Sequence, residues 1–153
     1  MPPAPAPKHP RVKKFTVAGC ELCEAAPVGV LWQDSFCRVV AVGDADYPGT
    51  CRVILDRHAG EMTDLTPAER SRLMKVVFAT ESALRVVARP DKINLASLGN
   101  AVPHLHWHVI PRYFDDRHFP RSIWAQPVRS PRRHRAPDRR ALARKLKALL
   151  GDA

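Results

Sequence analysis

Five short segments of the chain are largely apolar or alternate between apolar and polar residues, as half-buried β-strands do. They are residues 28–32, 36–42, 51–55, 92–98 and 105–111. Only Gln33, Asp34 and Ser35 separate the first two, and such a short polar connection predicts a hairpin. We therefore expect an antiparallel sheet of about five strands.

A period of three to four residues replaces this pattern in the middle of the chain and predicts one long helix over residues 67–88. Thr66 supplies an N-cap hydroxyl, Pro67 suits the first helical position, and Glu69 completes a capping box. Pro90 ends the run. The recurring positions are Leu73, Val76, Val77, Thr80, Ala83, Leu84 and Val87.

Leucines at similar spacing predict a second helix near the C-terminus, over residues 138–150. They are Leu142, Leu146, Leu149 and Leu150. The expected fold class is therefore α+β, with the long helix packed on one face of the antiparallel sheet and a basic helix at the C-terminal end.

The chain has 153 residues, which allows one domain with a hydrophobic core and is too short for two full domains. We expect a disordered, proline-rich basic leader at 1–14, the domain at 15–126 and a basic tail with a helix at 127–153. The leader carries four basic groups and the tail nine basic and two acidic groups, so subtracting +4 and +7 from the net charge of +10 leaves the domain at −1. No aromatic residues interleave the tail for base stacking, which disfavours nucleic acid as a partner of the tails.

No segment is apolar over the roughly 20 residues that a membrane-spanning helix needs. The chain does not open on a signal peptide, so we expect a cytoplasmic protein with no membrane partner. In that compartment Cys20, Cys23, Cys37 and Cys51 are expected to be reduced thiols or metal ligands and not disulfides.

Three histidines, His104, His106 and His108, occupy every second position of one predicted strand. Successive side chains of a strand point to opposite faces, so we expect the three imidazoles on one face and Leu105 and Trp107 on the other. Burying unpaired imidazoles is costly, which favours a functional site. Two kinds of chemistry fit: binding of a metal ion, and nucleophilic catalysis in which one imidazole attacks phosphorus while a neighbour protonates the leaving group.

The run GNAVPHLHWHVIPR, residues 99–112, resembles the signature of the histidine-triad superfamily, in which three histidines alternate with apolar residues. The resemblance covers about residues 20–126 and neither basic tail. It implies that the middle histidine, His106, is the nucleophile that takes the nucleotidyl group. His108 would then contact the phosphate or the leaving group.

The same resemblance implies positions that contact the nucleotide. Asn94 and Asn100 fall where members of the superfamily contact ribose or phosphates, and Asn100 replaces the more usual glutamine or serine. Thr50 lies near the position where many members have a fourth active-site histidine. Leu31 and Phe36 are our candidates for the apolar cleft around the base, and a purine preference is implied by the resemblance alone.

Cys20 and Cys23 form a C-x-x-C pair, which by itself is also compatible with two free cysteines. The segment that leads to His58 resembles the corresponding segment of galactose-1-phosphate uridylyltransferase and of bacterial histidine-triad hydrolases. That resemblance implies a structural zinc ion held by Cys20, Cys23, His58 and His104, with Cys51 as a competing fourth ligand. Four protein ligands leave no open position for water, so such a zinc would stabilise the fold and not perform the chemistry.

We therefore expect a nucleotide hydrolase or transferase that forms a covalent nucleotidyl intermediate on His106, most simply an AMP adduct. Its substrates would have the form nucleoside-phosphate-X, such as dinucleoside polyphosphates or nucleoside phosphoramidates. Related dimers imply a homodimer, in which Trp124 would stack on a base or pack at the interface. His118 follows the triad strand on a polar loop and is expected in solvent, with contact to substrate as the less favoured alternative.

The main alternative is a non-catalytic, zinc-stabilised nucleotide-binding module whose basic tail recruits nucleic acid or a protein. Thr50, in place of a fourth histidine, favours this alternative, whereas the intact pair of His106 and His108 argues against it. A metalloenzyme that uses the triad as its zinc site is disfavoured, because Cys20 and Cys23 would then lack a purpose.

Overall fold

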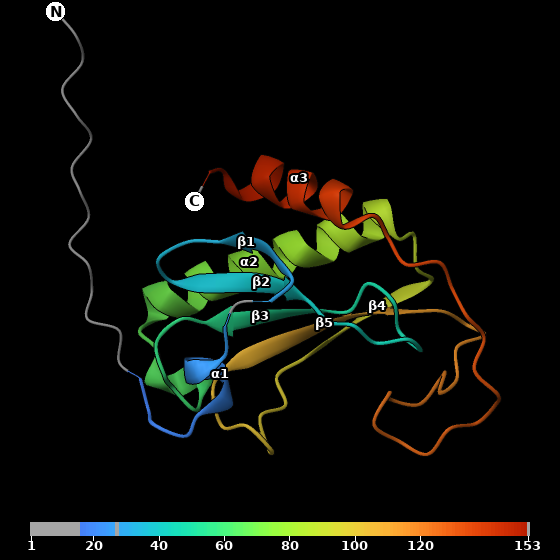
Figure 1. The fold of residues 1–153 in the computed structure, drawn as a ribbon, viewed down its shortest axis with the longest axis horizontal. Helices are drawn as coiled ribbons and strands as arrows, with labels where there is room; N and C mark the ends of the chain where they lie inside the picture. The colour runs from blue at the N-terminus through green and yellow to red at the C-terminus, as the bar shows by residue number, and fades with distance from the viewer. Residues whose placement is uncertain (1–15, 27, 153) are drawn as a thin grey trace, which may run out of the picture.

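The strands of the described chain form one antiparallel sheet in the computed structural model, which describes residues 16–26 and 28–152 (Figure 1). The predicted leader at residues 1–14 lies outside the described residues. The strands are β1 (Val30–Gln33), β2 (Cys37–Ala41), β3 (Cys51–Leu55), β4 (Lys92–Ala96) and β5 (His106–Arg112), in the order β1-β2-β3-β5-β4. The predicted α+β fold with about five antiparallel strands is confirmed.

The strand bounds agree with the predicted segments to within two residues. One difference affects the site, because β5 begins at His106 and the expected strand position of His104 is therefore wrong. The backbone of Leu105 is bonded instead to Ala59 and Leu55, at 2.7 Å and 3.2 Å. His104 therefore lies in the segment that directly precedes β5.

The long helix α2 (Pro67–Val87) begins where its local signals predict. Thr66 N donates to the Glu69 carboxylate at 2.8 Å, and Glu69 N donates to Thr66 Oγ1 at 3.3 Å, which forms the expected capping box. A short 3-10 helix, η1 (Met62–Asp64), precedes it. No described helix is both long enough and apolar enough to cross a membrane.

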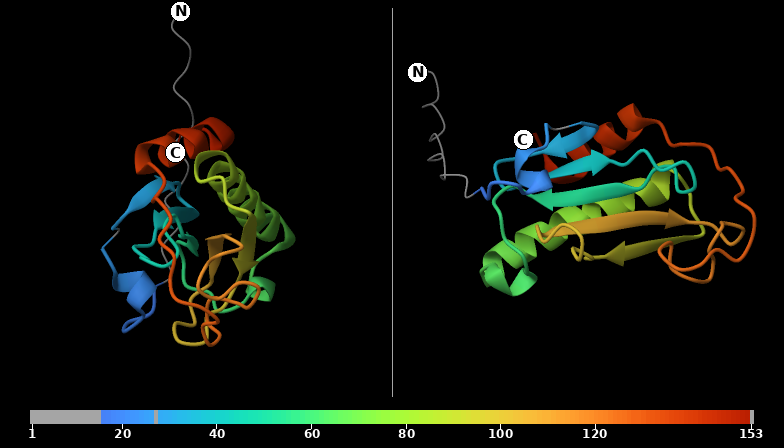
Figure 2. Two further views of the ribbon diagram at one scale, coloured as in Figure 1. Left: turned by 90° about the vertical axis from the view of Figure 1, so that its right-hand side faces the viewer. Right: turned by 60° about the horizontal axis from the view of Figure 1, so that its bottom comes forward.

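The hydrophobic core lies between α2 and one face of the sheet. From β3, the side chains of Cys51, Val53 and Leu55 enter this core. Helix α3 (Arg139–Leu150) packs against α2 and β1, and its Leu142 and Leu146 are 2% and 1% exposed (Figure 2). The C-terminal segment is therefore part of the packed structure.

The opposite face of the sheet, which we call the open face, carries the short helix α1 (Glu21–Glu24). Figure 2 shows α1 and α2 on opposite sides of the sheet. Leu22 of α1 packs there with Val40 and Ile54. Since β3 and β5 pair antiparallel with Ile54 opposite His106, the side chains of His106 and His108 emerge on this face.

Candidate active site and metal centre

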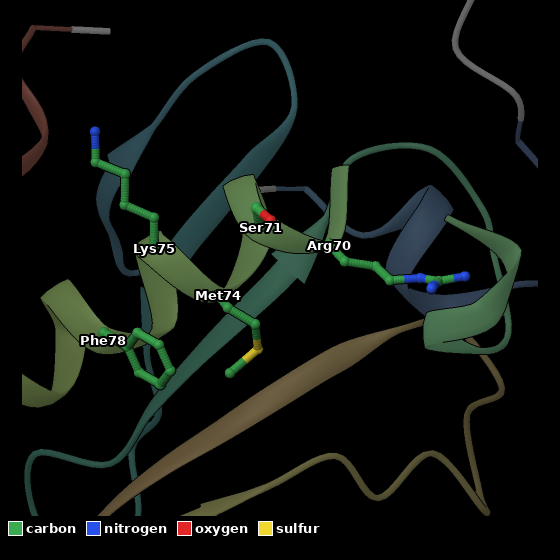
Figure 3. A pocket seen from close by; sticks show the side chains of 5 residues that line it. All are labelled: Arg70, Ser71, Met74, Lys75 and Phe78. Atoms are coloured by element: carbon green, nitrogen blue, oxygen red, sulfur yellow. The ribbon is translucent and has the colours of Figure 1, made fainter. Parts of the chain in front are cut away.

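A hollow of about 560 Å³ lies on the outer side of α2 (Figure 3). The residues that line it are Arg70, Ser71, Met74, Lys75 and Phe78. All five come from a single helix, and none is a carboxylate, histidine or cysteine. We assign no chemistry to this hollow.

A smaller cleft, of about 340 Å³, lies on the open face and contains the predicted reaction centre. It is formed by α1, β3, β5, the loop between β4 and β5, and the segment that carries Trp124. The lining residues are Glu21, Leu22, Arg52, Leu98, Asn100, Ala101, Val102, His106, His108 and Trp124. Three predicted site residues, Asn100, His106 and His108, therefore meet in one cleft.

The backbone fixes the tautomer of His106. Its Nδ1 lies 2.6 Å from the carbonyl oxygen of His104, and a carbonyl only accepts hydrogen bonds. In the neutral ring Nδ1 therefore carries the proton, and Nε2 has a lone pair with no partner among the described residues. In this tautomer Nε2 is the nitrogen that can act as a nucleophile.

His108 lies beside His106 in an environment that disfavours charge. The ring centroids of the two histidines are 4.9 Å apart, and the ring of Trp124 lies 5.1 Å from that of His108 on the other side. Burial, together with the neighbouring His106 and Arg52, lowers the pKa of His108 to about 4. At neutral pH His108 is therefore uncharged, and it is a better hydrogen-bond acceptor than proton donor.

Arg52 is a cleft residue that sequence reasoning missed. It lies in β3 directly opposite His108 of β5. The signal was present in the sequence: Cys51 and Val53 face the core, so the residue between them must face the histidines. Trp124, expected to stack on a base or pack a dimer interface, lines the same cleft.

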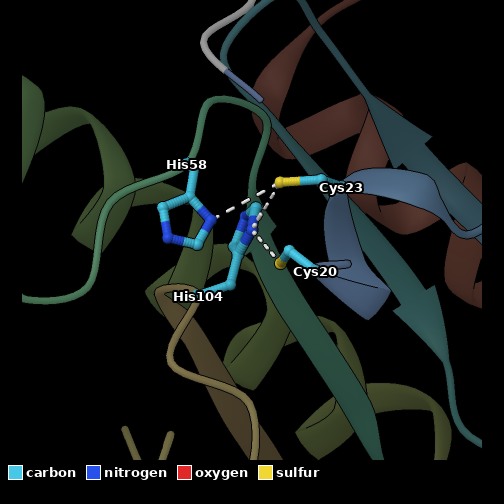
Figure 4. A group of neighbouring side chains, drawn as sticks. All are labelled: Cys20, Cys23, His58 and His104. Atoms are coloured by element: carbon cyan, nitrogen blue, oxygen red, sulfur yellow. Dashed lines mark hydrogen bonds between the residues drawn. The ribbon is translucent and has the colours of Figure 1, made fainter. Parts of the chain in front are cut away.

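Four ligand atoms converge next to the cleft, from the side chains of Cys20, Cys23, His58 and His104 (Figure 4). All lie within 4.8 Å of one another. His104 Nδ1 is 3.4 Å from each sulfur, and His58 Nδ1 is 3.5 Å from the Cys23 sulfur. Tetrahedral zinc with its usual Zn–S and Zn–N distances places S and N ligands about 3.6 Å apart, so the residues fit a Cys2His2 metal site.

The backbone also orients His104 toward this cluster. Its Nε2 lies 2.7 Å from the Leu55 carbonyl oxygen, so Nε2 carries the proton and Nδ1 presents its lone pair to the sulfurs. Cys51, the competing ligand, is buried in the core, with its Sγ 3.3 Å from the Gly49 carbonyl oxygen. The structure thus groups His58, and not Cys51, with the other three ligands.

Asn94 does not line the cleft. Its Oδ1 accepts a hydrogen bond of 2.7 Å from Arg112, which also forms a buried ion pair of 2.7 Å with Asp116. Burial alone would raise the pKa of Asp116, but hydrogen bonds from Arg112 and from three backbone N–H groups lower it to about 2. The structure therefore places Asn94 in a polar network with Arg112 and Asp116, outside the set of residues that line the cleft.

His118 and Thr50 are buried, and both form hydrogen bonds with Tyr47. The expected solvent exposure of His118 is wrong: the side chain is 7% exposed, and its Nδ1 is hydrogen-bonded to the Tyr47 hydroxyl. Thr50 Oγ1 donates to the Tyr47 carbonyl oxygen at 2.7 Å. Neither residue lines the cleft.

Leu31 and Phe36 pack against the core on the α2 side of the sheet. The guanidinium of Arg72, from α2, lies 4.6 Å from the centre of the Phe36 ring. Neither apolar residue lines the cleft, so the structure does not support them as walls of a base site. The apolar walls are instead Leu22, Leu98, Ala101 and Val102.

Comparison with known proteins identifies a family for most of this core. The family model for the HIT domain matches residues 24–115. The matched segment contains the five strands and α2 of the described structure, together with the cleft histidines.

Three relatives illustrate the similarity. A curated protein, AP-4-A phosphorylase from Mycobacterium tuberculosis, is 36% identical over 81 residues, which are 47% of this chain and 40% of that protein, so the match spans only two fifths of the relative. A histidine triad protein from Bradyrhizobium japonicum has 32% identity and a TM-score of 0.64, over 76% of this chain and 89% of that one. A Zn-bound histidine triad family protein from Mycobacterium smegmatis shares the fold, with 24% identity and a TM-score of 0.56 over 82% of this chain and 85% of that one.

Proposed function

Because the chain belongs to the HIT domain family, we propose that it is a nucleotide hydrolase or nucleotidyltransferase with His106 as its nucleophile. The observation that carries the proposal is the 2.6 Å hydrogen bond from His106 Nδ1 to the His104 carbonyl, which makes Nε2 the nitrogen with the lone pair in the neutral ring. The similarity to AP-4-A phosphorylase supports a nucleotide as substrate.

In the proposed reaction His106 Nε2 attacks the α-phosphorus of a nucleoside-phosphate-X and forms an N–P bond, and X leaves with the electron pair of the P–X bond. Water, or another acceptor, then attacks the same phosphorus, and the N–P electron pair returns to Nε2. The His104 carbonyl holds the imidazole in the required orientation throughout. Asn100 and Trp124 line the cleft, where Asn100 would hydrogen-bond the ribose or a phosphate and Trp124 would stack on a purine.

The test is mass spectrometry of the intact protein, quenched rapidly after mixing with a fluorogenic adenosine phosphoramidate. We expect an adduct of one AMP on the wild-type protein and none on His106→Ala. His134→Ala is the matched control, since His134 pairs with Asp115 and does not line the cleft, and it should keep the adduct.

Absence of both adduct and turnover, with nucleotide still bound, would contradict the enzyme and favour the non-catalytic nucleotide-binding module. An adduct that persists on His106→Ala would instead place the nucleophile on another residue.

We also propose that Cys20, Cys23, His58 and His104 hold a structural zinc ion. The donor set and its spacing support this, as does the existence of a Zn-bound protein with the same fold. With four protein ligands, a bound zinc would offer no open position to substrate and would cross-link the N-terminal segment to the loops that precede α2 and β5.

A homodimer is proposed as well. β4 is an end strand of the described sheet, and an end strand offers unpaired backbone groups to a second chain. Light scattering coupled to gel filtration should give twice the monomer mass at micromolar concentration, whereas a monomer mass would contradict the dimer.

A further inference from the structure

Arg52 faces the two histidines of the cleft across a strand pair. Its Cα is paired with that of His108 in the β3–β5 register, and Ile54, two residues on, is paired with His106. Residues at i and i+2 of a strand share a face, so Arg52 projects from the face that carries the histidines. It lines the cleft with both of them.

The guanidinium of Arg52 lacks the hydrogen-bond and ion-pair partners that those of Arg38 and Arg112 have. Among the described residues, its buried Nε has no hydrogen-bond partner and no carboxylate forms an ion pair with its guanidinium. Arg38, on the same face in β2, is by contrast bonded to the Leu22 carbonyl at 2.8 Å and lies 3.7 Å from Asp56. A buried donor without a partner costs free energy, so its presence in a cleft indicates a group that is satisfied by a ligand.

The geometry points to Arg52 as the residue that binds the departing phosphate and selects substrates with an anionic leaving group. On this inference, which rests on the proposed function, the chain prefers dinucleoside polyphosphates to nucleoside phosphoramidates. The fixed positive charge and the planar donors of a guanidinium match a phosphate, and they provide nothing that an amine needs.

The two leaving groups differ in their need for a proton. When His106 Nε2 bonds to the α-phosphorus of a dinucleoside polyphosphate, the P–O bond breaks and its electron pair leaves on a phosphate oxygen, where a guanidinium stabilises the charge. When X is an amine, the P–N bond breaks and the nitrogen must take up a proton as it leaves. Arg52 cannot supply that proton, because a guanidinium is not deprotonated in proteins, and the buried His108 is uncharged at neutral pH.

The experiment compares kcat/KM for diadenosine tetraphosphate and for an adenosine phosphoramidate in wild type, Arg52→Gln and Arg52→Lys. We expect Arg52→Gln to lose about 100-fold or more on the tetraphosphate and less than about threefold on the phosphoramidate, as for removal of one donor to a developing oxyanion. Arg52→Lys, which keeps the charge but not the planar fork, should fall in between. Arg57→Gln is the matched control, because Arg57 pairs with Glu69 at 3.1 Å and does not line the cleft.

Equal losses on both substrates, or no loss on either, would overturn the inference. Circular dichroism and thermal melts of each variant identify a loss of activity that comes from misfolding. If Arg52→Gln misfolds, Arg52→Lys is compared with wild type in its place.

A binding measurement separates this inference from the proposed function. Wild type should bind α,β-methylene-ADP at least about tenfold more tightly than AMP, and Arg52→Gln should bind the two equally. This result would support Arg52 as a phosphate ligand even if no turnover were found. Equal binding of both nucleotides by wild type would overturn the inference while leaving a His106 adduct unaffected.

Discussion

At the scale of single residues, His106 and His108 show that two identical side chains can differ in their properties because their neighbours differ. A backbone carbonyl fixes the proton of His106 on Nδ1. The pKa of His108 is instead lowered by burial and by the adjacent His106 and Arg52. Two imidazoles with ring centroids 4.9 Å apart therefore lie in different surroundings.

The low pKa of His108 predicts a loss of stability in mild acid. Its pKa is about 4 in the folded chain against the usual 6.5, so the unfolded chain binds more protons between these values. The associated stability is complete above pH 6.5 and is lost as the pH falls through this window to 4. Between pH 7 and pH 4.5, urea unfolding of His108→Gln should show a loss smaller than that of wild type by about 1 kcal/mol, a value reduced for solvent screening. Identical pH dependence in the two proteins would refute this assignment.

The ion pair of Arg112 and Asp116 makes a second residue-scale prediction. The side chains are 2% and 1% exposed, so Arg112→Met leaves a buried carboxylate without its partner. We expect the free energy of unfolding to fall by about 3–5 kcal/mol, measured by urea denaturation. Arg132→Met, which removes an ion pair between Asp115 and an arginine that is 74% exposed, should cost less than about 1 kcal/mol. Similar losses in both variants would show that burial is not what makes the pair important.

At the scale of elements, the sequence predicts a helix or strand correctly where the signals for it lie within the segment itself. The capping box at Thr66 and Glu69 and the apolar spacing that follows predicted α2 to within one residue at its C-terminal end. The strand segments were equally accessible, because their periodicity is local.

The predictions that were not met concern residues whose surroundings depend on how distant elements pack. Alternation along a strand separates its two faces but does not say which face a helix covers. Leu31 and Phe36 were therefore placed at the site although they lie on the side of α2, and Arg52 was overlooked although it lies on the side of the histidines. The hydrogen bond that occupies Asn94 comes from Arg112, a neighbour in space that periodicity cannot identify.

Helix α3 allows a prediction about the C-terminal segment. Leu146 is 1% exposed and Leu149 is 41% exposed on the same helix. Leu146→Ala should therefore lower the free energy of unfolding by about 2–5 kcal/mol and Leu149→Ala by less than about 1 kcal/mol. Truncation after Gln126 should also lower the melting temperature, because it uncovers the surface of α2 and β1 that α3 buries. If the truncated chain melted like the full chain, α3 would contribute nothing to stability.

At the scale of the whole molecule, the metal centre predicts how the N-terminal segment is held. The purified protein should carry about one zinc per chain by elemental analysis, and Cys23→Ser should lose the metal and melt at a lower temperature. Chelator treatment of wild type should produce the same shift. Cys37→Ala is the matched control, since Cys37 is a buried β2 cysteine outside the cluster, and it should keep its zinc. Full zinc content in Cys23→Ser would rule out these ligands.

His104 joins two parts of the molecule that could otherwise change independently. Its imidazole belongs to the metal cluster, while its carbonyl oxygen holds the proton of His106. A mutation that shifts this one peptide unit would alter both the anchor of the chain and the basic nitrogen of the nucleophile. Substitution of Cys20 or Cys23 is therefore expected to affect reactivity as well as stability. Anyone who redesigns this protein without its metal must first find another way to hold the carbonyl of residue 104 in place.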